Sequence, residues 1–459
     1  MVVTIRVCIP MVLVFFFLVT TCQRNRVWSD EFTLWKDTTL KSPCNARSHM
    51  NLAIEYNEKG NTQRALQELE RALELKPHDA LIHNNFGIVY IKMEQYQPAL
   101  EAFKEALKLT PHYSHAHYNL GTLYTHYQKY SDAIACFKKA LSFKPLYPKA
   151  YNNLGYVYHL QGRNDETLEL CKKALALDPS LMEAHLNLGR AYREKRLYDE
   201  ALDELRQALT LSPDNVVLLE EMAVVYNMKG SYDSAIECLS RALRHTPDAA
   251  RIYTILATSY KLKKQYQKAV EGYSRALTLD PTLLEAYYNL GICYQDLTLY
   301  PQAIECYKKV LAINGEYIQA YNNLGNVYGA LGNHDQAIGE YKKALTVKPD
   351  YYQALVNLGN AYNKKGWYPQ AEASLHKALQ VAPASARAYL NLGDTCSLKG
   401  QHQEAIKYYD IALKYNPSLI TAHLHLADIY AHKVKDQKRA DYHLKKAASL
   451  KAEKTEERH

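Results

Sequence analysis

The stretch HYNLGTLYTHYQKYSDAIACFKKALSFKP, residues 117–145, decides the fold of this 459-residue chain. Its apolar residues recur every three or four positions in two runs, a period that is typical of amphipathic helices burying one face. A proline, Pro145, follows the second run and is expected to end it. The stretch therefore predicts two antiparallel helices, which we call helix A and helix B.

The same pattern returns along the chain with a period of 34 residues, for example at 320–349 as AYNNLGNVYGALGNHDQAIGEYKKALTVKP. A fixed period of this length predicts an all-α solenoid of stacked helix pairs, and it overrides the several domains that the length alone would suggest. Counted in this phase, residues 46–453 hold twelve repeats, the last of which begins its helix B (Ala440, Leu444, Ala447) one residue late. The prolines in phase are Pro43, Pro77, Pro111, Pro145, Pro179, Pro213, Pro247, Pro281, Pro349, Pro383 and Pro417, with Gly315 at the remaining step.

Glycines recur at two positions of the repeat. Because Gly inside a helix costs roughly 1 kcal/mol, its recurrence at position 8 predicts that the backbones of helices A and B approach too closely for a larger side chain. Gly at position 15 favours a left-handed stop after helix A. Position 8 is Gly at Gly87, Gly121, Gly155, Gly189, Gly291, Gly325, Gly359 and Gly393, and position 15 is Gly at Gly60, Gly162, Gly230, Gly332, Gly366 and Gly400.

The composition argues against several classes of function. Lys and Arg number 56 against 48 Asp and Glu, a net charge of +8 without a polybasic block, so no nucleic-acid partner is predicted. Nine cysteines without a CxxC pair indicate neither a disulfide framework nor a zinc module. The motifs GxSxG, HExxH, GxGxxG and GxxxxGKS/T do not occur. We therefore expect no catalytic residue, no cofactor and no metal, in a protein that is not an enzyme.

The histidines and cysteines of the array are interpreted as structural. The histidines that could suggest a metal site are expected to be solvated turn residues; they are His112, His115, His117, His423 and His425. The cysteines fall mostly at core positions, where small buried hydrophobic side chains are expected. They are Cys136, Cys238 and Cys306 at position 23, Cys171 at position 24 and Cys396 at position 11.

Position 6 carries the candidate site. Asn is a poor mid-helix residue, and an amide offers donors and an acceptor that can pair with the backbone of an extended peptide. The alternative is that this Asn is a repeat consensus copied by duplication. Glu221, Ile255 and His425 interrupt the series and leave two blocks, 46–215 and 284–419. The Asn ladder consists of Asn51, Asn85, Asn119, Asn153, Asn187, Asn289, Asn323, Asn357 and Asn391.

Across residues 46–453 these repeats resemble the tetratricopeptide repeat. The resemblance implies a right-handed superhelix of about twelve helix-turn-helix units, with the A helices lining its inner groove. It says little about function, because such arrays serve many partners. The array of O-linked N-acetylglucosamine transferase has a similar Asn ladder, which implies that the groove binds peptides.

An apolar segment precedes the array. Residues 7–22 (VCIPMVLVFFFLVTTC) are uncharged and, with 2–5, just reach membrane-spanning length as one N-terminal hydrophobic helix. We favour an uncleaved single-pass anchor over a cleaved secretory signal, because the segment lacks a small residue at a cleavage site. A buried hydrophobic helix is the third reading. Arg24 and Arg26, against Arg6, would place the array in the cytoplasm by the positive-inside rule.

Residues 24–47 (RNRVWSDEFTLWKDTTLKSPCNAR) carry a second resemblance, to the junction before the repeats in membrane-embedded glycosyltransferases such as the transmembrane O-mannosyltransferase family. It implies a luminal or periplasmic array, against the Arg bias. The multi-span catalytic region of that family is not in this sequence, so its activity is not carried over. Within the junction, 30–41 would cap the first repeat. The matching residues are Arg24, Asn25, Trp28, Asp30, Glu31, Leu34 and Trp35.

The sequence thus predicts a non-catalytic interaction scaffold that binds extended protein segments in its groove. The alternative is an accessory, substrate-binding part of a membrane protein-glycosylation system whose catalyst is a separate chain. The predicted organisation is an anchor or signal segment (1–22), a linker with a half-repeat capping helix (23–45), the array (46–453) and a polar tail (454–459). The predicted location is membrane-anchored, with secretion as the alternative.

Overall fold

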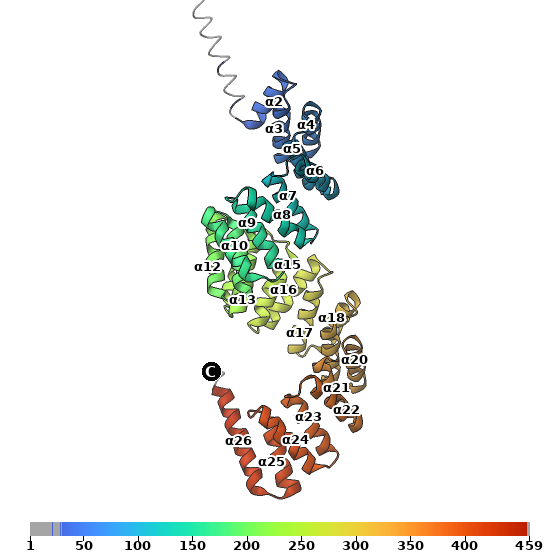
Figure 1. Ribbon diagram of the computed structural model, residues 1–459. Helices are drawn as coiled ribbons and strands as arrows, with labels where there is room; N and C mark the ends of the chain where they lie inside the picture. Colours follow the sequence, from blue (N-terminus) through green and yellow to red (C-terminus); the bar gives the residue numbers. More distant parts are fainter. Residues whose placement is uncertain (1–20, 22–27, 29, 457–459) are drawn as a thin grey trace, which may run out of the picture. The chain divides into compact units, whose positions relative to one another are not determined.

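A computed structural model describes residues 21, 28 and 30–456. These residues form helices joined by short turns, with no strand among them (Figure 1). The contacts between Cα atoms divide the chain into two compact units, unit 1 (1–225) and unit 2 (226–459), and each is described by itself. The all-α prediction is confirmed.

Within residues 30–225 of unit 1, a short helix, α2, is followed by the A and B helices of consecutive repeats. Their bounds are α2 Glu31–Lys41, α3 Ala46–Glu58, α4 Thr62–Leu75, α5 Ala80–Lys92, α6 Tyr96–Leu109, α7 Ser114–His126, α8 Tyr130–Phe143, α9 Pro148–Leu160, α10 Asn164–Leu177, α11 Met182–Glu194 and α12 Tyr198–Leu211. Helix α13, Val216–Lys229, crosses the division between the units.

The helices of unit 2 follow the same plan. Their bounds are α14 Tyr232–His245, α15 Ala250–Leu262, α16 Tyr266–Leu279, α17 Leu284–Asp296, α18 Tyr300–Ile313, α19 Ile318–Ala330, α20 His334–Val347, α21 Tyr352–Lys365, α22 Tyr368–Val381, α23 Ala386–Leu398, α24 His402–Tyr415, α25 Ile420–Ile429, the π-helix η1 Tyr430–Val434 and α26 Gln437–Glu456.

The turn between helices A and B has the left-handed residue that position 15 predicts. Gly60 has φ +80°; its N–H donates to the carbonyl of Asn57 (3.0 Å), and the N–H of Asn61 donates to the carbonyl of Tyr56 (2.8 Å). These bonds satisfy the last carbonyls of the helix, as in a Schellman-type stop. All six position-15 glycines have φ between +73° and +86°. Five repeats make the same turn without Gly: Glu94, Gln128, Arg196, Lys264 and Thr298.

Thr298 is the most strained of these non-glycine residues, because a β-branched side chain disfavours φ +59°. We expect Thr298→Gly to raise the free energy of unfolding by about 1 kcal/mol, since relief of strain outweighs the entropy of an added glycine. Urea denaturation followed by circular dichroism measures this. The reverse change, Gly332→Thr, serves as the control and should destabilise the chain; equal stability of Thr298→Gly and wild type would contradict the strain.

The position-8 glycines mainly meet side chains of helix B, and only Gly155 and Gly189 also lie close to its backbone, so the expectation of close backbones is corrected for the others. A Cβ added to Gly325 would lie 2.5 Å from the ring carbon Cε1 of Tyr341, and one added to Gly189 would lie 2.9 Å from Cγ of Leu205. Both partners occupy position 24, on the face of helix B that packs against helix A. The glycine therefore makes room for a large position-24 side chain.

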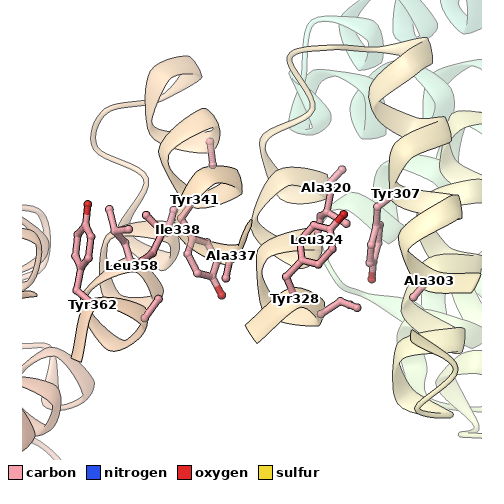
Figure 2. Packing of buried hydrophobic residues seen from close by; sticks show 14 of the residues in the cluster. Ala303, Tyr307, Ala320, Leu324, Tyr328, Ala337, Ile338, Tyr341, Leu358 and Tyr362 are labelled. Atoms are coloured by element: carbon pink, nitrogen blue, oxygen red, sulfur yellow. The ribbon is translucent and has the colours of Figure 1, made fainter. Parts of the chain in front are cut away.

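One core cluster of unit 2 shows how these positions build the interior (Figure 2). Tyr307 from α18, Leu324 and Tyr328 from α19, Tyr341 from α20 and Tyr362 from α21 belong to one layer of buried residues. Small residues such as Ala303 and Ala337 belong to the same cluster and are fully buried. The core is thus continuous along neighbouring repeats within the unit, as expected for a solenoid.

The last repeat carries its extra residue as a π-helical turn. Helix α25 passes into η1 (Tyr430–Val434), and Lys435 takes the left-handed conformation one residue later than position 15 requires. A single inserted residue inside a helix is typically absorbed in this way. Ala440 and Ala447 are buried, whereas Leu444 is exposed.

The predicted apolar segment, 1–22, lies outside the described residues except for residue 21. Among the helices that the structure does describe, none has the length and apolar character needed to cross a membrane. Helix α2 follows this region and begins at its N-cap Asp30, whose carboxylate accepts from the N–H of Thr33 (3.2 Å). Phe32 and Trp35 pack against the core of the first repeat, and the Phe32 ring meets Tyr56 edge-on at 5.1 Å.

Candidate functional site

The Asn ladder lies on the A helices, where those of successive repeats contact one another. Such contacts join α3 to α5, α7 to α9 and α9 to α11 in unit 1, and α15 to α17, α19 to α21 and α21 to α23 in unit 2. Most ladder side chains are half-buried, while Asn187 and Asn289 are buried. The ladder therefore lies partly in the interfaces between the A helices of successive repeats.

Five ladder amides donate a hydrogen bond to the preceding A helix. In each case the acceptor is the side chain 35 residues earlier, at position 5 of the previous repeat. Sequence analysis missed this pairing, although a polar residue at position 5 signals it. The pairs are Asn119 with Asn84 (2.9 Å), Asn187 with Asn152 (2.9 Å), Asn357 with Asn322 (3.0 Å), Asn153 with the Tyr118 hydroxyl (3.1 Å) and Asn323 with the Tyr288 hydroxyl (3.2 Å).

The other ladder amides lack such a donor bond. Met50 and Val356 stand 35 residues before Asn85 and Asn391, and an apolar side chain offers no acceptor. Neither of these amides makes a side-chain hydrogen bond to another described residue, and the same holds for Asn51. Asn289 instead accepts from Nζ of Lys261 (2.6 Å). The ladder thus contains fixed amides and unpaired amides.

Two unpaired amides, Asn51 and Asn85, line one pocket of unit 1 with a volume of about 380 Å³. The pocket lies between α3, α5 and the turn that precedes α7. Apolar side chains such as Met50 and Ile54 line it beside the polar amides. This combination suits an extended peptide, because amides can pair with its backbone while apolar walls take a side chain.

A second pocket, of about 270 Å³, lies in unit 2 among α21, α23, α24 and α25. Its wall is polar and includes Asn360, Asn363, Asp394 and His425. His425 interrupts the ladder, and its Nδ1 lies 2.8 Å from Oδ1 of Asp394. This hydrogen bond to the carboxylate raises the pKa of His425, because it favours the charged imidazolium.

The other charged interruption, Glu221 in unit 1, forms ion pairs in place of an amide contact. Its carboxylate lies 2.7 Å from Arg190 and 2.5 Å from Arg193, both on α11. The Glu221 side chain is buried, so the two guanidinium groups compensate a charge that would otherwise be costly. Arg190 and Arg193 on the polar face of α11 are therefore engaged in ion pairs within the chain.

Several histidines are buried at position 4, which corrects the prediction of solvated turn residues for His117 and His423. Nε2 of His117 lies 2.9 Å from the carbonyl of Pro111, and Nε2 of His423 lies 3.3 Å from that of Pro417. The periodic proline thus supplies a carbonyl six residues earlier. Sequence analysis missed this contact, although the fixed spacing of six residues from the proline to the histidine signals it. The same bond occurs at His49, His83 and His185.

The cysteines behave as the sequence predicts. Cys136, Cys171, Cys306 and Cys396 are buried, and Cys238 is partly buried. Burial raises the pKa of the Cys136 thiol to about 11 and that of Cys171 to about 12, so both stay protonated at neutral pH. Within the described residues no group of His, Cys, Asp and Glu side chains is arranged to hold a metal ion.

Comparison with known protein families agrees with the geometry. Sequence models described as tetratricopeptide repeat match residues 46–112, 147–214, 282–350, 350–415 and 192–258, and a TPR repeat model matches 123–162. A model described as anaphase-promoting complex, cyclosome, subunit 3 matches residues 228–310. A comparison with curated proteins finds no match.

Several solved structures are similar to parts or most of this chain. MamA is 30% identical over 35% of this chain and 95% of its own, with a TM-score of 0.34. The Cut9–Hcn1 hetero-tetramer of the APC/C is 16% identical over 94% of this chain and 92% of its own, with a TM-score of 0.45. The human IFIT1 dimer with m7Gppp-AAAA is 21% identical over 81% and 90%, with a TM-score of 0.46.

Proposed function

We propose that this chain, which belongs to the tetratricopeptide repeat family, is a non-catalytic scaffold that binds extended segments of other proteins along its Asn ladder. The observation that carries the proposal is the pair of unpaired amides, Asn51 and Asn85, that face one pocket beside apolar side chains. An amide without an internal partner keeps two donors and its acceptor for a peptide backbone.

The fixed amides have a supporting role in this proposal. When Asn119 or Asn187 donates one N–H to the preceding repeat, it keeps the second N–H and the lone pairs of its oxygen. The hydrogen bond holds the side chain in one orientation, which lowers the entropy that a bound peptide would have to remove. All nine ladder residues belong to the proposed binding face, in which the buried Asn187 and Asn289 would contact a peptide least.

The first test removes the unpaired amides. Peptides that bind the full-length chain are selected from a display library of random 12-residue sequences, and their affinities are measured by fluorescence anisotropy. We expect the double variant Asn51→Ala, Asn85→Ala to bind the selected peptides about thirtyfold more weakly, because each of the two lost hydrogen bonds costs about 1 kcal/mol. Its melting temperature should match that of wild type.

The matched control removes two fixed amides, Asn119→Ala and Asn187→Ala. Each loses a bond between repeats, so each should lower the free energy of unfolding by about 1 kcal/mol. A library that yields no binding peptide would count against the scaffold. Selected peptides that bind both double variants as tightly as wild type would remove the ladder from the mechanism.

A second candidate function rests on the junction 24–47, which resembles that of membrane-embedded glycosyltransferases. In this proposal the array presents protein substrates to a separate catalytic chain, 1–22 is a membrane anchor or signal segment, 23–45 is a linker with the capping helix, 46–453 is the array and 454–459 is the tail. Protection of the array from protease in intact vesicles is the expected result. Digestion from outside sealed, correctly oriented vesicles would contradict a luminal array.

A further inference from the structure

The polar pocket of unit 2 is built from three consecutive A helices and one B helix. Asn360 and Asn363 come from α21, Asp394 from α23 and Asp428 from α25, while Tyr409 of α24 closes one side. The side chains at position 9 here are Asn360, Asp394 and Asp428, where the first repeats of unit 1 have Ile54 and Ile88. Two carboxylates and two amide oxygens in the lining can accept hydrogen bonds, beside the basic groups of Lys364 and His425 and the apolar side chains of Leu398 and Ile429.

Asp394 is held in place by its neighbours but keeps one oxygen for a ligand. The Tyr409 hydroxyl donates to Oδ1 of Asp394 (2.7 Å), and Nδ1 of His425 lies 2.8 Å from the same oxygen. Oδ2 makes no hydrogen bond to another described residue. Two contacts at one oxygen orient the carboxylate, so its second oxygen is preorganised to accept from a ligand.

Asn363 provides an independent observation at the same pocket. Its side chain is 7% exposed, and its Nδ2 donates to the Thr395 hydroxyl (2.9 Å) and, at 3.4 Å, to the carbonyl of Asn391. These bonds fix the orientation of the amide, and its buried Oδ1 has no hydrogen-bond partner among the described residues. A buried carbonyl oxygen without a donor is unfavourable, so a donor that reaches it from the pocket would be favoured.

The pocket holds two basic groups, Lys364 and His425, as well as two carboxylates. His425 already pairs with Oδ1 of Asp394, so the oxygens that remain for a ligand are Oδ2 of Asp394 and those of Asp428. Asp394 and Asp428 contribute two carboxylates, of which Asp428 is largely exposed and lies 3.7 Å from Nε2 of His432. Lys364 also lines the pocket, but it is exposed on a long, flexible side chain and can turn towards solvent. An anionic ligand would meet both carboxylates, whereas an ammonium or guanidinium group has only donors to offer to these acceptors.

We propose that this pocket binds the basic side chain, lysine or arginine, of a peptide segment that lies along the Asn ladder. The proposal rests on the proposed peptide-binding function and adds a specificity to it. Asp394 and Asp428 supply the charge, and Asn363 and Asn360 accept hydrogen bonds from the ammonium or guanidinium group. The segment would be recognised by one basic residue placed opposite repeats 10–12.

The test compares selections from the same display library of random 12-residue peptides on full-length wild type and on the variant Asp394→Asn, Asp428→Asn. We expect lysine or arginine to be enriched at one position on wild type, and this enrichment to be lost on the variant. Asp350→Asn, which removes an exposed carboxylate outside the pocket, is the matched control and should keep the enrichment. Melting curves of all three proteins verify that they are folded.

A double-mutant cycle then tests the contact directly. Replacing the enriched basic residue of one selected peptide by norleucine should weaken binding to wild type about tenfold. The same replacement should change binding to the Asp394→Asn, Asp428→Asn variant less than twofold. Enrichment without a basic residue, or enrichment of acidic residues, would overturn this inference and leave the proposed peptide binding intact. A library from which no peptide is enriched on wild type would overturn both.

Discussion

His185→Leu is expected to lower the free energy of unfolding of this chain by about 3 kcal/mol, measured by urea denaturation followed by circular dichroism. Nε2 of His185 lies 3.1 Å from the carbonyl of Pro179, and its Nδ1 lies 2.7 Å from Oε2 of Glu204. The side chains of His185 and Glu204 are 7% and 19% exposed, respectively. Leucine fits the space, since Leu219 and Leu355 occupy this position in other repeats. It leaves the carbonyl of Pro179 and the largely buried carboxylate of Glu204 without their partner.

Two controls separate this loss from a general effect of the substitution. His83→Leu removes a longer contact, 3.4 Å to the carbonyl of Pro77, in a repeat that has Ala102 where Glu204 stands, so its cost should stay below about 1 kcal/mol. Adding Glu204→Leu to His185→Leu should recover part of the stability, because no carboxylate is then left unpaired. Equal costs for His83→Leu and His185→Leu would contradict the role of Glu204.

Helix boundaries were predictable from the sequence because the information that sets them is local. Pro77 stops helix B through its missing N–H, and the turn before it requires a left-handed residue that Gly60 supplies without strain. Each signal acts within a few residues and recurs every 34 residues, so neighbouring repeats confirm one another. Even the late start of the last helix B could be read from the shifted alanines, although not the π-helical turn that absorbs it.

Contacts between helices were harder to predict because they join residues that are distant in sequence. The Asn ladder was predicted from the residue pattern of single helices, whereas Asn119 forms a hydrogen bond with Asn84 in the preceding repeat. The same limit hid the contact of His185 with Glu204, which lie 19 residues apart. The pocket around Asp394 combines four helices, so no single motif indicated it. Comparing each position with the residue 35 earlier would have separated the five fixed amides from Asn85 and Asn391, although not from Asn289, which follows Thr254 at this spacing.

Gly87→Ala is expected to lower the free energy of unfolding by about 2 kcal/mol. The new Cβ would lie 2.4 Å from Cε1 of Phe103, a ring that is fully buried and cannot move away without displacing its neighbours. Overpacking of this kind typically costs 1–3 kcal/mol, which exceeds the gain of about 1 kcal/mol in helix propensity when the clash is this close. Chemical denaturation of the full chain measures the difference.

A second substitution should reverse most of this loss. The first repeat has Ala53 at position 8 opposite Leu69 at position 24, both buried, so Phe103→Leu in the Gly87→Ala background rebuilds a pair that this fold already contains. We expect the double variant to lie within about 1 kcal/mol of wild type, a coupling that only residues in contact show. Gly155→Ala is the control: its Cβ would meet Sγ of Cys171 at 3.1 Å, a smaller group, so stability should change little or rise. If Gly87→Ala and Gly155→Ala behave alike, the side chain at position 24 does not select the glycine.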